Sequence, residues 1–284
     1  YMKDFSICFN VEHPKVIDCY NNRNNYQIQL SEDGDPNLCA IYFTSHALYY
    51  PNTESEFTRS VLESDRYEWY KSRHLNAGKH IFVRDVFKQW YLKGINGSIN
   101  SPDLLLRFLK HQTEGMEVVT IGASAGGYAA ILYGCMLNAK SVLAFNPQIN
   151  LYQELTSSSE SENLFLYKFK NTELSRFYNL NNCLSSNTDI FYVYSTLSQW
   201  DLTHCGLLCQ ADNIHRIPIR SNLHGVPVPM LVLREFISSK RETLLRFARK
   251  ENRPVRIMIY LNFRNTIIHY IKIYTNILKT KLCR

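Results

Sequence analysis

The sequence feature that most constrains the fold is the segment over residues 117–134, in which EVVTI is followed by GASAGG and then by YAAILYG. The first part is an apolar β-rich run and the last part has an apolar helical pattern, so the glycines lie where a strand turns sharply into a helix. Gly122, Ser124 and Gly126 complete the pattern G-x-S-x-G. Flanking glycines relieve the crowding in such a turn, which lifts the serine hydroxyl above the sheet. The segment predicts a strand, a strained turn and a helix from Ala125 to about Asn138.

The remainder of the chain alternates apolar β-rich runs with helical patterns, which predicts an α/β fold with a mostly parallel central sheet flanked by helices. Ser101 and Pro102 predict the start of one helix, and Gly115 follows its end. A further helix is expected from about Pro229 to Arg249. The predicted strands are Tyr26 to Leu30, Leu38 to Thr44, His80 to Val83, Glu117 to Ile121, Ser141 to Phe145, Asp189 to Tyr194 and Ile214 to Ile219.

The length and composition favour one large folded domain with an appended segment, because the chain has 284 residues of which 45% are hydrophobic. We expect the main domain over residues 1–250. The polar run TSSSESEN over residues 156–163 suggests an insertion over about residues 151–187 that covers an edge of the sheet. Residues 251–284 form a basic C-terminal segment.

The formal net charge of +7 resides in that terminal segment. Residues 250–284 hold eight Lys or Arg residues against Glu251, so the first 249 residues are formally neutral. No nucleic-acid motif accompanies this charge, and we therefore expect no nucleic-acid partner. Over residues 255–282, apolar residues recur at helical spacing with basic residues between them. This pattern fits either a helix on an anionic membrane surface or a helix docked on the domain.

A serine hydroxyl is a weak nucleophile until a base takes its proton, and the base in turn needs an acid to fix its tautomer. In folds with this turn, the acid and the histidine follow the serine along the chain. Asp201 follows the run DIFYVYSTLSQW, and His224 lies in SNLHGVP after the last predicted strand. Both come just beyond carboxyl ends of strands, where loops converge on the turn. The sequence therefore predicts a catalytic triad of Ser124, Asp201 and His224.

Other residues compete for these roles. Asp189 begins one predicted strand and Asp212 precedes the last one, which places both at the wrong edge of the sheet. His204 follows Asp201 on the next predicted helix and is better suited to support the site, whereas His215 lies inside a strand. A tight glycine-rich turn with an uninvolved serine remains the simplest alternative for the segment around Ser124.

An acyl-transfer site also needs N–H donors for the oxyanion. The turn itself predicts the N–H of Ala125 as one donor, and the loop FTSHALYY offers that of Ser45 or His46 as another. Four residues that follow the strand HIFV have the charged and aromatic character of a sugar platform, although packing within a loop explains them equally well. They are Arg84, Asp85, Trp90 and Tyr91.

The eight cysteines are scattered without a CxxC pair, which is typical of reduced thiols in a cytoplasm. We expect no metal, because the group with His204, Cys205, Cys209 and His215 lacks a recognised zinc spacing. No stretch reaches the ~18 consecutive apolar residues of a membrane-spanning helix, and residues 1–10 lack the pattern of a signal peptide. We therefore expect a cytoplasmic protein, or one that lies on the inner face of the membrane through its basic segment.

Four segments together resemble α/β-hydrolase-fold proteins of bacterial capsule and lipopolysaccharide gene clusters: IGASAGGYAA, VRDVFKQWYLKGI, QWDLTHC and LHG. The resemblance covers roughly residues 38–225. Some members of that group are polysaccharide O-acetyltransferases. The resemblance implies serine-dependent O-acetyl transfer to a bacterial surface polysaccharide through an ester on Ser124, with acetyl-CoA as donor. The sequence TSHA stands where lipases have an HGGG-type oxyanion loop, which separates this chain from the lipase pattern.

Two alternatives remain open. A carbohydrate or small-ester esterase would use the same nucleophile, base and oxyanion donors, with water as the acceptor. A hydrolase-fold scaffold of a polysaccharide assembly would bind through the basic segment without chemistry, since a fold alone does not establish an activity.

Overall fold

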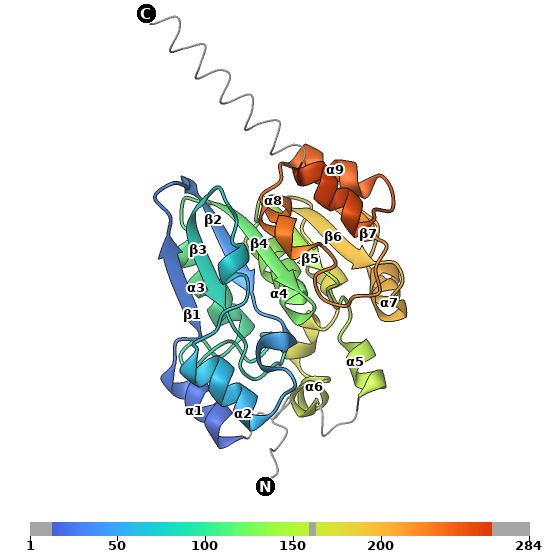
Figure 1. Cartoon of the computed structure of the whole chain (residues 1–284). Coiled ribbons are helices and arrows are strands. Elements are labelled where there is room, and N and C mark those ends of the chain that lie inside the picture. Colours follow the sequence, from blue (N-terminus) through green and yellow to red (C-terminus); the bar gives the residue numbers. More distant parts are fainter. Residues whose placement is uncertain (1–12, 159–162, 263–284) are drawn as a thin grey trace, which may run out of the picture.

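The computed structural model describes residues 13–158 and 163–262, and it consists of a central sheet with helices on both faces (Figure 1). The sheet has seven strands in the order β1-β3-β2-β4-β5-β6-β7. β1 is antiparallel to β3, and every other pair is parallel. The strands are β1 (Tyr26–Leu30), β2 (Asp35–Phe43), β3 (Ala77–Val83), β4 (Glu117–Ala123), β5 (Ser141–Phe145), β6 (Asp189–Ser195) and β7 (Ile214–Ile219).

All seven strands predicted from the sequence are confirmed, with ends that differ by at most a few residues. The inner strands read as continuous apolar runs because both of their faces are covered. In β4 and β5, almost every residue is buried. Since the carboxyl ends of parallel strands meet at one edge of a sheet, the loops after β4, β5, β6 and β7 converge there.

Helices cover the two faces of the sheet. The α-helices are α1 (Pro14–Asn22), α2 (Glu54–Phe57), α3 (Pro102–Gln112), α4 (Ala125–Met136), α5 (Tyr152–Ser157), α6 (Leu164–Phe169), α7 (Gln199–Leu207), α8 (Leu233–Ile237) and α9 (Arg241–Ala248). α3 and α4 pack into the core on one face, while α8 and α9 pack on the other. The predicted start of α3 is confirmed, because Ser101 Oγ accepts the N–H of Leu104 and Pro102 is the first helical residue.

The prediction of one helix from Pro229 to Arg249 is wrong, because the chain breaks into α8 and α9. Two serines at the break form hydrogen bonds between their side chains and backbone groups. Ser239 Oγ donates to the carbonyl of Glu235, and Ser238 Oγ accepts the N–H of Leu75. This second contact ties the break to the loop before β3.

The segment expected as an insertion contains α5 and α6, followed by short 3₁₀ turns. It packs directly on α4, where the hydroxyl of Tyr128 donates to the carbonyl of Phe177. Tyr178 and Leu180 are buried in the same core cluster as α4. That this segment acts as a cap over the sheet edge stays a prediction, as does the domain boundary at residue 250.

The predicted basic segment is only partly described. A helical stretch begins at residue 254 and reaches the end of the described residues at 262. Ile257 and Leu261 are buried against the cluster that contains α8 and α9, whereas Val255 and Ile259 are exposed. The rest of the predicted amphipathic helix, over residues 263–282, lies outside the described residues. Within the part of the chain that the structure describes, no helix is both long and apolar enough to span a membrane.

Candidate active site

Ser124 occupies the sharp turn between β4 and α4, with φ 52° and ψ −123°. A residue other than glycine is rarely found at positive φ, and such strain concentrates at functional sites. The flanking residues Gly122 and Gly126 permit the turn because neither position has room for a Cβ atom. A Cβ atom on Gly122 would lie 2.0 Å from the carbonyl oxygen of Gly126, and one on Gly126 would lie 2.2 Å from that of Phe43. The pattern G-x-S-x-G thus has a steric cause at both glycines.

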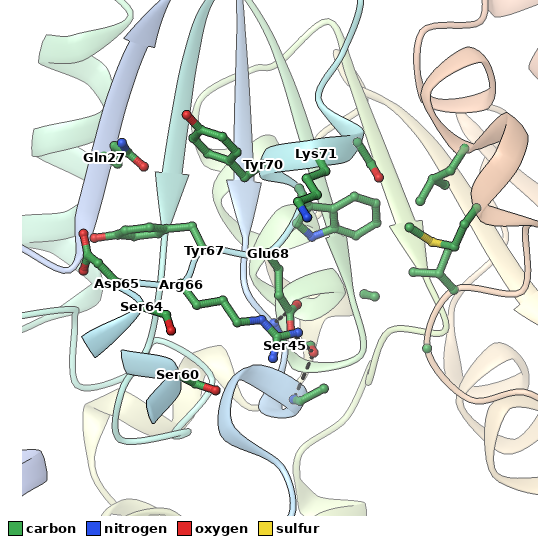
Figure 2. A pocket seen from close by; sticks show the side chains of 18 of the residues that line it. Gln27, Ser45, Ser60, Ser64, Asp65, Arg66, Tyr67, Glu68, Tyr70 and Lys71 are labelled. Carbon is green, nitrogen blue, oxygen red and sulfur yellow. Dashed lines mark hydrogen bonds between the residues drawn. The ribbon is translucent and has the colours of Figure 1, made fainter. Parts of the chain in front are cut away.

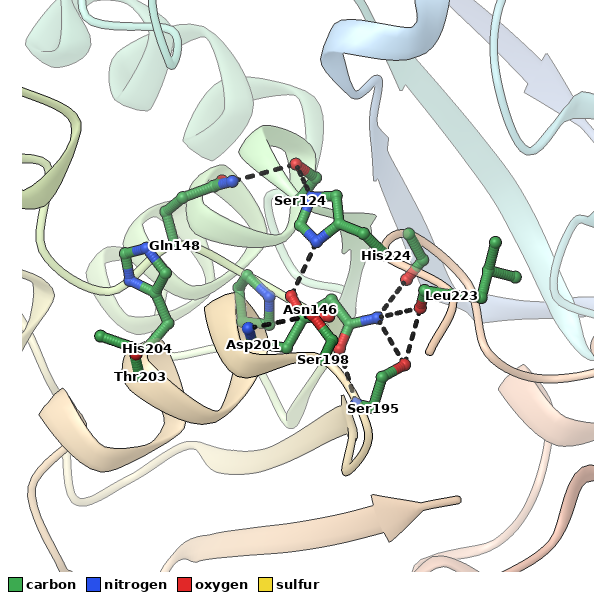
Figure 3. Close-up of polar contacts among 12 residues, drawn as sticks. Ser124, Asn146, Gln148, Ser195, Ser198, Asp201, Thr203, His204, Leu223 and His224 are labelled. Atoms are coloured by element: carbon green, nitrogen blue, oxygen red, sulfur yellow. Dashed lines mark hydrogen bonds and ion pairs between the residues drawn. The ribbon is translucent and has the colours of Figure 1, made fainter. Parts of the chain in front are cut away.

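The structure brings the three residues of the predicted triad together (Figure 3). His224 Nε2 lies 2.9 Å from Ser124 Oγ, and His224 Nδ1 lies 2.7 Å from Asp201 Oδ1. A carboxylate only accepts hydrogen bonds, so Nδ1 carries the proton and Nε2 accepts from the serine hydroxyl. The Asp201 side chain is 1% exposed and that of His224 is 41% exposed. The arrangement suits the removal of a proton from Ser124 by His224.

Asp201 is held at the amino-terminal end of α7. Ser198 caps this helix, and its Oγ accepts the N–H of Asp201. The first turn of a helix favours a carboxylate because of its unpaired N–H groups and the helix dipole. The competing Asp189 lies at the start of β6, where it contacts His215 at 2.8 Å and Arg241 at 2.6 Å. Asp189 therefore lies at the amino end of its strand, as the sequence predicts.

The loop that carries His224 is fastened to the ends of β5 and β6. Asn146 Nδ2 donates to the carbonyls of Leu223 and Gly225, at 3.1 and 3.2 Å. Ser195 Oγ also donates to the Leu223 carbonyl, at 2.7 Å, and the Ser195 N–H donates to Asn146 Oδ1. Both residues that flank His224 are therefore bound to one buried asparagine.

His204 lies beside the triad without replacing its base. It is buried on α7, and its Nδ1 accepts the N–H of Ile149 at 3.1 Å. Burial lowers the pKa of His204 to about 4. Glu154 Oε1 lies 3.8 Å from His204 Nε2, and burial raises the pKa of Glu154 to about 7. His204 is therefore a buried neutral support for the loop after β5, as its position in the sequence suggests.

The predicted oxyanion donors differ in their surroundings. Ala125 is the first residue of α4, so its N–H has no acceptor within the helix. Ser45 does not match the prediction, because its N–H donates to Glu68 Oε2 at 2.8 Å and its Oγ lies 3.0 Å from Glu68 Oε1. Burial raises the pKa of Glu68. His46 opens the 3₁₀ turn His46–Tyr49 beside Ser45, and its role as a donor stays a prediction.

The four residues expected to bind sugar are buried, which contradicts that expectation. Arg84 Nη1 lies 2.8 Å from Asp65, and its guanidinium covers the ring of Tyr67. The Asp85 carboxylate accepts three backbone N–H groups of the following turn, and burial raises its pKa to about 6. Those N–H groups belong to Phe87, Gln89 and Tyr91. Packing within a loop is therefore the better interpretation of this group.

Trp90 and Tyr91 are also buried, and both have positive φ, which turns the chain inward. The Tyr91 hydroxyl donates to the carbonyl of Thr44 at 2.9 Å. The Trp90 indole N–H donates to Gln148 Oε1 at 3.4 Å, and Gln148 Nε2 donates to Ser124 Oγ at 3.1 Å. Trp90 thus reaches the site through Gln148, a residue that sequence reasoning missed. The only sequence signal for Gln148 is its position just after a predicted strand.

Figure 2 shows a cleft of about 1040 Å³, whose lining includes chain neighbours of two triad residues. Its lining includes Ala123 and Gly225, the chain neighbours of Ser124 and His224, and three apolar side chains at and before the start of α8, namely Val226, Met230 and Leu233. Aromatic, hydroxyl and charged side chains line the remainder. They are Ser45, Arg59, Ser60, Ser64, Asp65, Arg66, Tyr67, Glu68, Trp69, Tyr70, Lys71 and Ser72.

Within residues 13–158 and 163–262, no group of three or more His, Cys, Asp or Glu side chains is arranged to hold a metal ion. Of the residues considered for zinc, His204 lies 3.8 Å from Glu154 and His215 lies 2.8 Å from Asp189.

The mostly parallel sheet with its strand-turn-helix at Ser124 is the α/β-hydrolase fold, which confirms the predicted fold class. The chain is similar to solved structures of the capsule O-acetyltransferase of Neisseria meningitidis serogroup A. Its complex with caged gadolinium matches with a TM-score of 0.51 and 14% identity, over 79% of this chain and 92% of that chain. A second structure of that enzyme has a TM-score of 0.50 at the same identity and coverage. The sequence matches no protein-family model and no curated protein.

Proposed function

We propose that this protein is a serine acyltransferase in which Ser124 carries the acyl group. One observation carries the proposal: the His224 ring lies between Ser124 Oγ and Asp201 Oδ1, with a hydrogen-bond distance to each. This is the geometry that a nucleophile, its base and the orienting acid require. The strained turn at Ser124 supports the same role.

In the proposed reaction, Ser124 Oγ attacks the acyl carbonyl of a thioester while His224 Nε2 takes the hydroxyl proton. The tetrahedral intermediate collapses, the carbon–sulfur bond breaks, and the thiolate leaves with the proton from His224. The acyl group remains as an ester on Ser124. His224 then removes a proton from the acceptor hydroxyl, whose oxygen attacks this ester, and the proton returns to Ser124. Asp201 stabilises the imidazolium in both halves of the reaction.

The acceptor that we propose is a bacterial surface polysaccharide, and the donor is acetyl-CoA. The cleft next to the triad has the aromatic and hydroxyl lining that suits a carbohydrate chain. The similar solved structure is of a capsule O-acetyltransferase, which makes this reaction the first to test. We place the protein in the cytoplasm or, through its basic C-terminal segment, on the inner face of the membrane.

Mass spectrometry of the intact protein tests the covalent step. Incubation with acetyl-CoA should add the mass of one acetyl group to the wild type and none to Ser124→Ala. Labelling by a fluorophosphonate probe should follow the same pattern. Acetylation that is unchanged in Ser124→Ala would rule out the mechanism, and an unlabelled wild type would favour a scaffold without chemistry.

Ester hydrolysis is the second candidate, because 41% of the His224 side chain is exposed and water can reach the base. The two reactions differ only in the acceptor that takes the acyl group from Ser124. Release of free acetate and formation of acetylated glycan should be measured together while the glycan concentration is raised. Transfer requires that glycan product increases at the expense of acetate, whereas a constant rate of acetate release would identify an esterase.

A further inference from the structure

Gln148 is the one residue besides His224 whose side chain is shown within hydrogen-bond distance of Ser124 Oγ among the described residues. It follows β5, two residues after Asn146, and its side chain is directed toward the triad (Figure 3). Its Nε2 lies 3.1 Å from Ser124 Oγ. Gln148 is 6% exposed. A buried carboxamide that contacts the nucleophile can act on the reacting atoms directly.

The orientation of this carboxamide follows from its second contact. The Trp90 indole N–H lies 3.4 Å from the other end of the Gln148 side chain. An indole N–H donates and never accepts, so the atom that faces it must be the carbonyl oxygen Oε1. The NH₂ group then faces Ser124. Trp90 is itself fixed, since it is buried and packs edge-on against the ring of His46, with 4.6 Å between the two ring centroids. Gln148 therefore presents a preorganised donor.

The site has a place for such a donor. Attack by Ser124 converts the acyl carbonyl into an oxyanion, which N–H groups stabilise. The turn supplies the N–H of Ala125, but that of Ser45 is engaged by Glu68. The oxyanion is bonded to the same carbon as Ser124 Oγ, so a donor already in contact with Oγ lies within reach of it.

We propose that Gln148 is a catalytic residue whose side-chain N–H stabilises the oxyanion during acylation and deacylation of Ser124, with Trp90 as its positioning residue. The inference rests on the proposed function. A neutral carboxamide stabilises the negative charge without exchanging a proton, so it does not compete with His224 as base. Its stabilisation is largest in the transition state, and its loss should lower kcat more than it changes KM.

Gln148→Ala should lower kcat for hydrolysis of a small soluble acetyl ester by about 100-fold or more, with KM nearly unchanged. Gln148→Glu keeps the size of the side chain but sets a carboxylate beside the oxyanion, so it should be slower than the alanine variant. Trp90→Phe keeps most of the ring and removes the indole N–H, and we expect a smaller loss. Gln199→Ala is the matched control, because Gln199 is exposed on α7 near the site. It should react as the wild type does.

The binding of a boronic acid, which forms a tetrahedral adduct on a serine, separates catalysis from structure. Gln148→Ala should bind it more weakly by a factor similar to its loss in kcat, while its melting temperature stays close to that of the wild type. A wild type that neither turns over the ester nor binds the boronic acid would overturn the proposed function. If the wild type turns over the ester and binds the boronic acid, and Gln148→Ala and Gln148→Glu are both as active as the wild type, only the role of Gln148 is overturned. A Gln148→Glu variant as fast as the wild type would overturn it too, since a purely structural role needs only the shape.

Discussion

The carboxamide of Asn146 binds the carbonyl of Leu223, the residue that precedes His224, at 3.1 Å. Through this bond and its second bond to Gly225, a residue at the end of β5 sets the position of a histidine that follows β7. Asn146→Asp should weaken the loop, because a carboxylate oxygen would face two carbonyl oxygens. We expect labelling of Ser124 by a fluorophosphonate to slow by about 10-fold or more, since small misplacements of a catalytic group are costly.

Asn25 provides the matched control for Asn146. It is equally buried, also has positive φ, and donates its amide to backbone carbonyls, but it lies beside β1. Asn25→Ala and Asn146→Ala should both lower the melting temperature, and only Asn146→Ala should slow the labelling. Equal labelling rates in the two variants would show that Asn146 supports the fold and not the histidine.

Asp201→Asn should reverse the tautomer of His224, because an amide N–H would face Nδ1 and leave Nε2 protonated against Ser124. The rate of ester turnover should fall by about 10³- to 10⁴-fold with little change in KM. Steady-state kinetics with a soluble ester measure this directly. Asp189→Asn is the comparison, since Asp189 bonds His215 and Arg241 at the amino end of β6. If Asp189→Asn is the slower variant, Asp201 is not the acid.

Gly126→Ala should be strongly destabilising. The added methyl group would lie 2.2 Å from the carbonyl oxygen of Phe43, and this backbone atom of β2 cannot move without disturbing the sheet. We expect a loss of about 3 kcal/mol or more in the free energy of unfolding, measured with denaturant. Gly206→Ala is the control, because nothing lies within 4 Å of its position in α7. It should raise stability by up to about 1 kcal/mol.

His80 should make the free energy of unfolding depend on pH. Burial lowers its pKa from 6.5 to about 4, and Nδ1 lies 2.9 Å from the hydroxyl of Tyr42. A group with a lowered pKa in the folded state contributes stability above pH 6.5, which is lost as the pH falls toward about 4. His80→Gln should therefore lose less unfolding free energy than the wild type on acidification, by up to about 1.4 kcal/mol per pH unit. Denaturation at several pH values tests this, and a parallel loss in both proteins would contradict it. The exposed His111, substituted in the same way, is the control position.

The sequence predicts the sheet well because its inner strands are covered on both faces and thus appear as uninterrupted apolar runs. The positions of Asp201 and His224 follow from chain order and from the shared edge at which parallel strands end. Helix breaks are harder to predict. At the break between α8 and α9, Ser238 accepts the N–H of Leu75, a residue far away in the sequence, and no local pattern reveals this contact.

The supporting residues of the site were beyond sequence reasoning for a similar reason. Gln148 is a single polar residue in a loop, and its importance depends on the distant Trp90. In the sequence, Arg84 and Asp85 fit a sugar platform as well as packing within a loop, because charged residues are mostly exposed in folded proteins. The left-handed backbone at Trp90 and Tyr91 instead folds this loop inward, and such conformations in residues other than glycine cannot be deduced from residue type.

Four neighbouring strands, β4 to β7, each deliver one member of the site in chain order: Ser124, Gln148, Asp201 and His224. In a chain under synthesis, Ser124 therefore emerges a hundred residues before His224, the residue that we propose as its base. Under the proposed mechanism, Ser124 has no base until the loop after β7 has emerged and docked on Asn146, and we expect it to stay inert toward esters before then. We therefore expect reaction at Ser124 to require completion of the sheet, so that it would mark a chain that has finished folding.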